Sequence, residues 1–259
     1  MDGRIVTLIT GANRGIGYEL ARILLRRPEY HILLGSRSAS IGNKAATALG
    51  DLPETQGSVE SILIDVQDNE SVDSAASKIA STHGRLDVLV NNAAINPESS
   101  FAGKLPLAAP ARDVLDSVLK TNVTGAVSVT EAMLPLMRKS STPRLIFVSS
   151  STGSLTHASD PTSRFHIASR TEYRLSKTAL NFIMVQYWAA LKDAGFLVFA
   201  ADPGLNATNL TGDADSLRAR GASEPHIGAE RIAKVVRGER DGDVGKVCGE
   251  YGNETICPW

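Results

Sequence analysis

The chain has 259 residues, a length that a single α/β sheet with its covering helices commonly fills. A formal net charge of −1 gives no electrostatic footprint for a nucleic-acid binder, and the two cysteines, Cys248 and Cys257, exclude a disulfide scaffold and a cysteine-rich zinc module. No uninterrupted apolar run is long enough to span a bilayer. Because no signal peptide, prenylation signal or peroxisomal signal is found, we expect a cytoplasmic protein with no membrane partner.

Short apolar runs rich in β-branched residues alternate with longer amphipathic stretches. Seven runs are predicted strands: Ile5–Thr10, His31–Ser36, Ser61–Asp65, Val88–Asn91, Leu145–Ser149, Leu197–Ala201 and a weaker Lys246–Gly249. Helical spacing is found at Ile16, Leu20, Ile23 and Leu24, and over Asn69–Ser81, Val114–Met137 and Glu172–Lys192. The polar stretch 211–228 is predicted to be a mobile loop. The alternation predicts one domain, 1–259, with a doubly wound, seven-stranded parallel sheet and helices on both faces.

A glycine-rich segment follows the first predicted strand directly. It reads Thr10-Gly11-Ala12-Asn13-Arg14-Gly15-Ile16-Gly17. Glycine permits the turn from strand to helix and lets the backbone approach a pyrophosphate, while the helix N-terminus offers free N–H groups and a positive dipole end. A glycine triplet alone is weak evidence, but its place between a strand and an amphipathic helix favours a dinucleotide site over a tight turn without a ligand.

Several motifs, in order along residues 10–208, resemble those of the short-chain dehydrogenase/reductase family in its compact single-domain form. They are the glycine loop 10–17, Asp65-Val66, Asn91-Asn92-Ala93-Ala94, Asn122, Ser150, Tyr173 with Lys177, and Pro203-Gly204 with Thr208. The resemblance implies a Rossmann-type fold. It implies cofactor contacts from Gly11, Asn13, Arg14, Gly15, Ile16, Gly17, Asp65, Val66, Asn92, Tyr173, Lys177, Pro203, Gly204 and Thr208. One position departs from the pattern, because Ala94 stands where the family signature has glycine.

The resemblance also implies a catalytic set of Asn122, Ser150, Tyr173 and Lys177. Tyr173 and Lys177 lie four residues apart on a predicted helix and so share one face. The ammonium is expected to lower the pKa of the phenol, ordinarily about 10, towards neutral pH. In carbonyl reduction Ser150 donates a hydrogen bond to the developing oxyanion and Tyr173 delivers the proton. By resemblance, Lys177 also holds the nicotinamide ribose, and Asn122 holds a water that links Lys177 to solvent.

Three consecutive serines end the fifth predicted strand. The family pattern places the catalytic serine three residues before a glycine, which is Ser150 counted back from Gly153. Ser149 and Ser151 are then expected to point to the other side of the strand end.

The end of the second predicted strand bears on the choice of nicotinamide cofactor. In the family, an acidic residue there binds the ribose 2′-hydroxyl of NAD, but Leu34-Gly35-Ser36-Arg37-Ser38 contains no acid. Arg37 lies where a guanidinium could grip a 2′-phosphate, and Arg14 adds a positive charge on the same side. NADP(H) is therefore the predicted cofactor. The alternative is that Arg37 is a solvated residue at the start of a helix.

Ser150 and Tyr173 lie farther apart than in most compact members of the family. The extra segment, 154–170, is expected to emerge at the mouth of the site because catalytic residues tether both its ends. It is expected to shape the substrate pocket or to block one oligomer surface; the alternative is a surface loop without a specific role. Carbonyl reductases of the family can carry an insertion here and some are monomers. The apolar helices 114–137 and 172–192 instead favour a homodimer, so the association state stays open.

No metal site is predicted. His157 and His166 lie in a loop without a carboxylate at ligand spacing. His31, His83 and His226 are expected to be surface or boundary residues rather than ligands.

Together these features predict an NADPH-dependent reduction of a ketone or aldehyde to an alcohol. The apolar residues Phe101, Leu105, Leu155, Phe165 and Leu205 suggest a medium-sized, partly hydrophobic carbonyl substrate. Two alternatives remain open. One is a non-catalytic NADP-binding regulator or scaffold, and the other is a pocket that templates a non-redox cyclisation or epimerisation.

Overall fold

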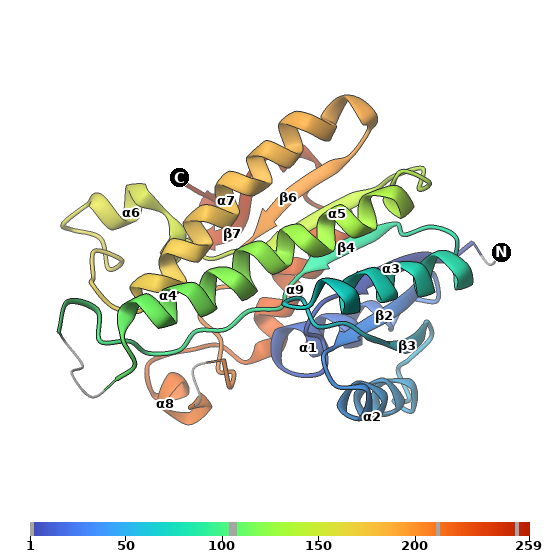
Figure 1. Cartoon of the computed structure of the whole chain (residues 1–259), viewed down its shortest axis with the longest axis horizontal. Helices are drawn as coiled ribbons and strands as arrows, with labels where there is room; N and C mark the ends of the chain where they lie inside the picture. Colours follow the sequence, from blue (N-terminus) through green and yellow to red (C-terminus); the bar gives the residue numbers. More distant parts are fainter. Residues whose placement is uncertain (1–2, 104–107, 211–212, 252–253) are drawn as a thin grey trace.

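A twisted sheet of eight strands runs through the computed structural model, which describes residues 3–103, 108–210, 213–251 and 254–259 (Figure 1). The strands are β1 (Ile5–Ile9), β2 (Tyr30–Ser36), β3 (Ser58–Leu63), β4 (Val88–Asn91), β5 (Arg144–Val148), β6 (Leu197–Ala201), β7 (Val247–Tyr251) and β8 (Glu254–Cys257). Their order is β3-β2-β1-β4-β5-β6-β7-β8. Strands β1 to β7 pair in parallel, whereas β8 runs antiparallel to β7. The predicted doubly wound sheet is confirmed, with an additional antiparallel edge strand.

Helices cover both faces of the sheet. They are α1 (Gly15–Leu24), α2 (Ala39–Gly50), α3 (Asn69–Thr82), α4 (Ala111–Leu119), α5 (Gly125–Met137), α6 (Leu155–Ser159), α7 (Thr171–Leu191), α8 (Ala214–Ala219) and α9 (Pro225–Val236). Apolar residues of α3, α5 and α7 build one core layer, and those of α1, α2 and α9 build the other. Among the described helices, none combines the length and the apolar character needed to cross a membrane.

Strand β1 shows why the strands of this sheet are predominantly apolar in sequence. Leu8 lies in the core under α3, α5 and α7, and its neighbour Ile9 lies in the core under α1, α2 and α9. Both are fully buried, as parallel strands covered on both faces require. Because β1 is flanked by β2 and β4, the strand order reverses here, and the crevice beyond the carboxyl ends of β1 and β4 is the expected ligand site of such a sheet.

Three predicted elements differ from the structure. The predicted helix 114–137 begins earlier, at Ala111, and is interrupted by a π-helical turn, Lys120–Thr124, between α4 and α5. Strand β3 begins at Ser58 rather than at Ser61. The predicted mobile loop over 211–228 is not a loop throughout its described part, because α8 and the start of α9 lie there.

Candidate active site

The glycine loop lies at the carboxyl end of β1, as predicted. Gly15 has a φ of +60°, in the left-handed region that favours glycine, and it opens α1. A Cβ on Gly17 would lie 2.6 Å from the side-chain nitrogen of Asn92, so only glycine fits between α1 and the end of β4. No side chain caps the start of α1 among the described residues. Its first N–H groups are therefore available to an anion.

Thr10 and Asn92 join the ends of β1 and β4 beneath this loop. The Thr10 hydroxyl oxygen accepts hydrogen bonds from the backbone N–H groups of Asn92 and Ala93, both at 3.0 Å. The Asn92 side chain donates to the Thr10 carbonyl at 2.8 Å. These bonds fix the floor of the crevice at the switch point of the sheet, which places Asn92 in the cofactor region assigned by resemblance.

Two exposed arginines lie at the carboxyl edge of the sheet. Arg14 precedes α1 directly, and Arg37 follows β2 directly. Neither forms an ion pair within the described part of the chain. Asp65 lies just beyond the end of β3, where its carboxylate accepts a hydrogen bond from the Gln67 N–H at 3.0 Å. The buried Val66 next to it packs directly against the start of α5.

Tyr173 and Lys177 project from one face of α7. The Lys177 ammonium is buried, lies 5.4 Å from the centre of the Tyr173 ring, and donates a hydrogen bond to the Val148 carbonyl at 2.6 Å. Burial lowers the pKa of Lys177 to about 8, partly opposed by the negative charge of Asp202. Burial, together with the charge of Asp202, raises the pKa of Tyr173. The expectation that the lysine lowers the pKa of Tyr173 is therefore wrong for this structure, in which burial and the charge of Asp202 decide the direction.

The three serines after β5 have different surroundings. Ser149 is buried and donates a hydrogen bond to the Asn181 side chain at 2.5 Å, and Ser151 is buried with its N–H bound to the Asp202 carboxylate at 2.9 Å. Ser150 is only partly buried, and its hydroxyl lies 2.9 Å from the hydroxyl of Thr152. Ser150 is thus the most accessible of the three, in line with its assignment from the sequence.

Asn122 lies in the π-helical turn between α4 and α5. Its amide oxygen accepts a hydrogen bond from the Ile95 N–H at 2.9 Å, and its amide nitrogen donates to the Ile95 carbonyl and to the Ser176 hydroxyl, both at 3.0 Å. The side chain therefore ties the segment after β4 to α7, which carries Tyr173. Single π-helical turns of this kind are frequent at functional sites, because they re-aim one side chain.

The segment after β6 approaches the glycine loop from the other side. Gly204 has a φ of +76°, and its N–H donates to the Asp202 carboxylate at 2.8 Å. The methyl group of Thr208 lies 3.8 Å from the place that a Cβ on Gly15 would occupy. The structure therefore brings Thr208, at the end of the predicted Pro203-Gly204 and Thr208 segment, beside the glycine loop.

Asp202 is a residue of this region that the motifs did not identify. It is buried, holds the backbone of Ser151 and Gly204, and its charge acts on both Tyr173 and Lys177. The signal for it in the sequence is an acidic residue directly after the apolar strand Leu197–Ala201, immediately before Pro203.

The insertion 154–170 packs against the outer side of α7. The Arg174 guanidinium donates hydrogen bonds to the carbonyls of Thr152, Phe165 and Ile167. A cavity of about 610 Å³ lies here; its lining includes Phe101, Leu155, Ile167, Leu175 and Ala179. Neither Ser150 nor Tyr173 lines it, so the insertion forms a cavity beside the predicted catalytic residues rather than over them. The predicted pocket residue Leu105 lies outside the described residues.

Comparisons with known proteins agree with this geometry. A family model described as short chain dehydrogenase matches residues 5–218. The chain is 36% identical over 254 residues to the short-chain dehydrogenase/reductase tropE of Talaromyces stipitatus, with 93% of each chain covered.

Two solved structures share the fold. One is the NADPH-bound carbonyl reductase from chicken fatty liver, with a TM-score of 0.80, 21% identity, and coverage of 99% of this chain and 100% of that one. The other is the 3-ketoacyl-(acyl-carrier-protein) reductase from Brucella melitensis complexed with NADH, with a TM-score of 0.75, 22% identity, and coverage of 96% and 97%. At such identities the likeness concerns the fold, and the two titles name different nicotinamide cofactors.

Proposed function

The chain belongs to the short-chain dehydrogenase/reductase family, and on that premise we propose that it is an NADPH-dependent oxidoreductase that reduces a ketone or aldehyde to an alcohol. The observation that carries the proposal is the grouping of Tyr173 and Lys177 on one face of α7 beside the strand end that bears Ser150. The turn after Ser150 packs closely on α7, since a Cβ on Gly153 would lie 2.8 Å from the backbone of Lys177.

The residues at the carboxyl edge of the sheet fit a dinucleotide. The open N-terminus of α1 and the loop residues Gly11, Asn13, Gly15, Ile16 and Gly17 would hold a pyrophosphate through backbone N–H groups. On this proposal, the remaining contacts come from Asp65 and Val66 at the adenine end, from Asn92 and Lys177 at the nicotinamide end, and from the segment of Pro203, Gly204 and Thr208, whose Thr208 lies beside the glycine loop.

Arg14 and Arg37 support NADP(H) over NAD(H). Both guanidinium groups are exposed, lie at the same edge of the sheet, and make no ion pair within the described part of the chain. A 2′-phosphate would give them the anionic partner that the protein does not, through charge-assisted hydrogen bonds. The absence of an acidic residue at the end of β2 removes the group that would repel this phosphate.

The side chains divide the chemistry between them. A nicotinamide held by Asn92 and Lys177 would, when bound, supply the hydride for reduction of a carbonyl carbon. Ser150 donates a hydrogen bond to the carbonyl oxygen as negative charge builds on it, and Tyr173 transfers its hydroxyl proton to that oxygen. The raised pKa of Tyr173 keeps its hydroxyl protonated at neutral pH, which suits a proton donor. Lys177, with a pKa of about 8, can return a proton towards Tyr173 near neutral pH.

The proposal is tested by NADPH consumption against a panel of ketones and aldehydes of medium size. We expect turnover with at least one carbonyl compound, and a kcat/KM for NADPH about 10 to 150 times that for NADH, as a single charge-assisted bond to a phosphate provides. A preference for NADH would overturn the cofactor assignment. Binding of NADPH without turnover of any carbonyl compound would favour the regulator, or the pocket that templates a non-redox reaction.

Association through α5 and α7 is a further part of the proposal. Leu175 and Phe182 on α7 are 43% and 65% exposed. Both are large apolar side chains, and contact with a partner chain would remove their surface from water. These side chains support a homodimer in which α7 packs against its counterpart. Sedimentation of the wild type and of Phe182→Asp tests it: we expect a dimer and a monomer, respectively, and a monomeric wild type would contradict the proposal.

A further inference from the structure

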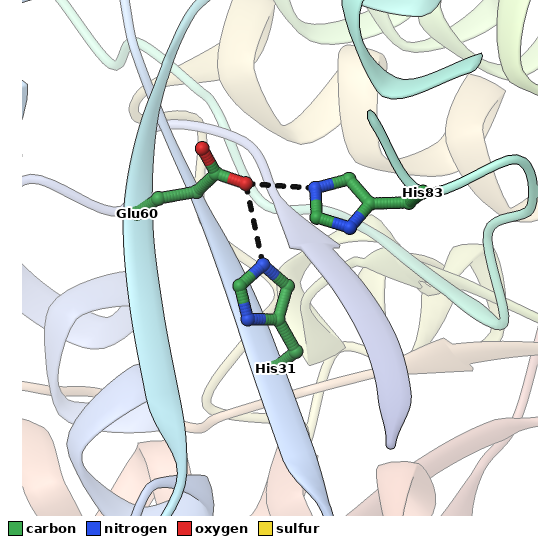
Figure 2. A group of neighbouring side chains, drawn as sticks. All are labelled: His31, Glu60 and His83. Carbon is green, nitrogen blue, oxygen red and sulfur yellow. Dashed lines mark hydrogen bonds and ion pairs between the residues drawn. The ribbon is translucent and has the colours of Figure 1, made fainter. Parts of the chain in front are cut away.

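Two histidines and a glutamate converge at the end of the sheet remote from the catalytic residues (Figure 2). His31 is the second residue of β2, Glu60 lies in β3, and His83 directly follows α3. The loops of the active site instead follow the carboxyl ends of the strands. We propose that His31, Glu60 and His83 form a binding site for a divalent transition-metal ion, with Zn²⁺ as its preferred occupant.

The three side chains point their ligand atoms at one place. Nε2 of His83 lies 2.7 Å and Nε2 of His31 lies 3.3 Å from the same oxygen, Oε1 of Glu60 (Figure 2). All three ligand atoms lie within 4.8 Å of one another. Tetrahedral zinc with bonds of about 2.0–2.1 Å separates its ligands by about 3.4 Å, so small side-chain rotations bring these atoms to coordination distance.

The kind of ligand selects the kind of metal. Imidazole nitrogen suits zinc, copper and nickel, whereas magnesium and calcium require oxygen ligands. Two imidazoles and one carboxylate form a known zinc ligand set that leaves the fourth position to water or to a bound group. The exposed fractions of the His31, Glu60 and His83 side chains, 19%, 35% and 17%, leave such a position open to solvent.

Neighbouring groups hold the ligands in place. Nδ1 of His31 lies 2.6 Å from the Ser58 hydroxyl, which also accepts a hydrogen bond from Arg4 at 2.7 Å. This contact orients the ring so that Nε2 faces Glu60, the arrangement in which an outer hydrogen bond fixes a metal-binding imidazole. His83 lies at the carboxyl end of α3, where the helix dipole favours a cation. The positive charge of Arg4, which is hydrogen-bonded to Ser58, would repel a metal cation and so weaken the affinity of the site for it.

From the sequence, His31 and His83 were expected to be surface or boundary residues rather than ligands. Residues 31, 60 and 83 match no ligand motif, and only the pairing of β2 with β3 and the packing of α3 bring them together. The site joins two strands and a helix end, so a bound ion would cross-link this edge of the sheet. We therefore expect it to stabilise the fold rather than to take part in the redox reaction.

The first test is direct binding by the whole protein stripped of metal. We expect calorimetry to show one Zn²⁺ per chain. At free zinc about one hundred times the dissociation constant, Tm is expected to rise by about 5–10 °C, with no such rise in Mg²⁺. Crystals soaked in ZnCl₂ are expected to show an anomalous peak about 2.0–2.1 Å from the two Nε2 atoms. Absence of a Tm rise, or a peak only elsewhere in the molecule, would overturn the proposal.

Variants separate this site from other zinc binding. His31→Gln and His83→Gln are expected to abolish both the calorimetric signal and the Tm rise, while circular dichroism and NADPH binding stay as in the wild type. His226→Gln, at an exposed histidine on α9, is the matched control and is expected to keep both. Zinc binding that survives in both His31→Gln and His83→Gln would contradict the assignment. The anomalous peak in wild-type crystals decides the matter without any variant.

Discussion

Replacing Lys177 with methionine is expected to change how the stability of the protein depends on pH. Burial lowers the pKa of Lys177 to about 8 in the folded protein, against an ordinary value of about 10.4 in the unfolded chain. Because the folded pKa is the lower one, the unfolded chain binds more protons between these values. The contribution of Lys177 to the free energy of unfolding therefore rises as pH increases from about 8 to about 10.5.

The shift gives the size of the effect. Relative to Lys177→Met, the wild type is expected to gain about 2–3 kcal/mol of unfolding free energy between pH 7 and pH 10, which corresponds to about 5–10 °C in Tm. Lys177 is only 3% exposed, so solvent screens this effect little. The raised pKa of Tyr173 acts in the opposite direction above pH 10, but both proteins contain Tyr173 and its effect cancels in the difference.

Urea unfolding of both proteins, followed by circular dichroism from pH 7 to pH 10 without added nucleotide, measures this difference. A difference that does not change with pH would refute the reasoning, because it would show that the Lys177 ammonium is not desolvated in the folded protein. The same variant is expected to lose NADPH-dependent reduction by a factor of about 10²–10⁴ without losing stability at pH 7. Such a result would mark Lys177 as a residue kept for function at the expense of stability.

Four further variants test individual features. Ser150→Ala is expected to lower kcat by about 10²–10³ because it removes a donor to the developing oxyanion. Ser149→Ala breaks a buried hydrogen bond instead, and is expected to cost about 1–3 kcal/mol of unfolding free energy with a smaller change in kcat; steady-state kinetics and urea unfolding compare the two. Gly17→Ala places a Cβ 2.6 Å from the side-chain nitrogen of Asn92. This variant is expected to lose about 1–3 kcal/mol of unfolding free energy and to bind NADPH more weakly in a fluorescence titration. Arg174→Gln removes hydrogen bonds to the insertion, and limited proteolysis is expected to cut 154–170 faster than in the wild type.

Each of these comparisons has an outcome that contradicts its basis. Equal losses of kcat in the Ser149 and Ser150 variants would remove the distinction between the two serines. A Gly17→Ala protein with wild-type stability and NADPH affinity would show that the close approach at the glycine loop is not required. Unchanged proteolysis of Arg174→Gln would show that the insertion is held by other contacts.

The sequence predicted the sheet and the order of its motifs because both depend on local patterns. A strand such as β1, with helices on both faces, is apolar at four of its five positions, and the glycines of its loop are required by backbone geometry near Gly15 and Gly17. Strand β8 escaped prediction because only half of its four residues, Ile256 and Cys257, are apolar. Helix α8 escaped because its signal is a single capping residue, Asp213, in a polar stretch.

Properties that arise from distant residues could not be predicted in this way. The expected low pKa of Tyr173 depended on neighbouring positive charge, above all that of Lys177 four residues away, whereas burial and Asp202 from another strand end decide the direction. The cluster of His31 and His83 with Glu60 likewise depends on strand pairing across the sheet. Local motifs therefore identified the candidate catalytic residues, while their electrostatics and the second cluster required the three-dimensional structure.

The central claim is that Tyr173 gives its proton to a carbonyl oxygen while NADPH is bound. Tyr173→Phe keeps the ring and removes only the hydroxyl, so NADPH binding measured by fluorescence is expected to match the wild type. Oxidation of NADPH by the best carbonyl substrate is expected to fall by about 10²–10⁴. A Tyr173→Phe protein that binds NADPH and reduces that substrate at the wild-type rate would contradict the claim.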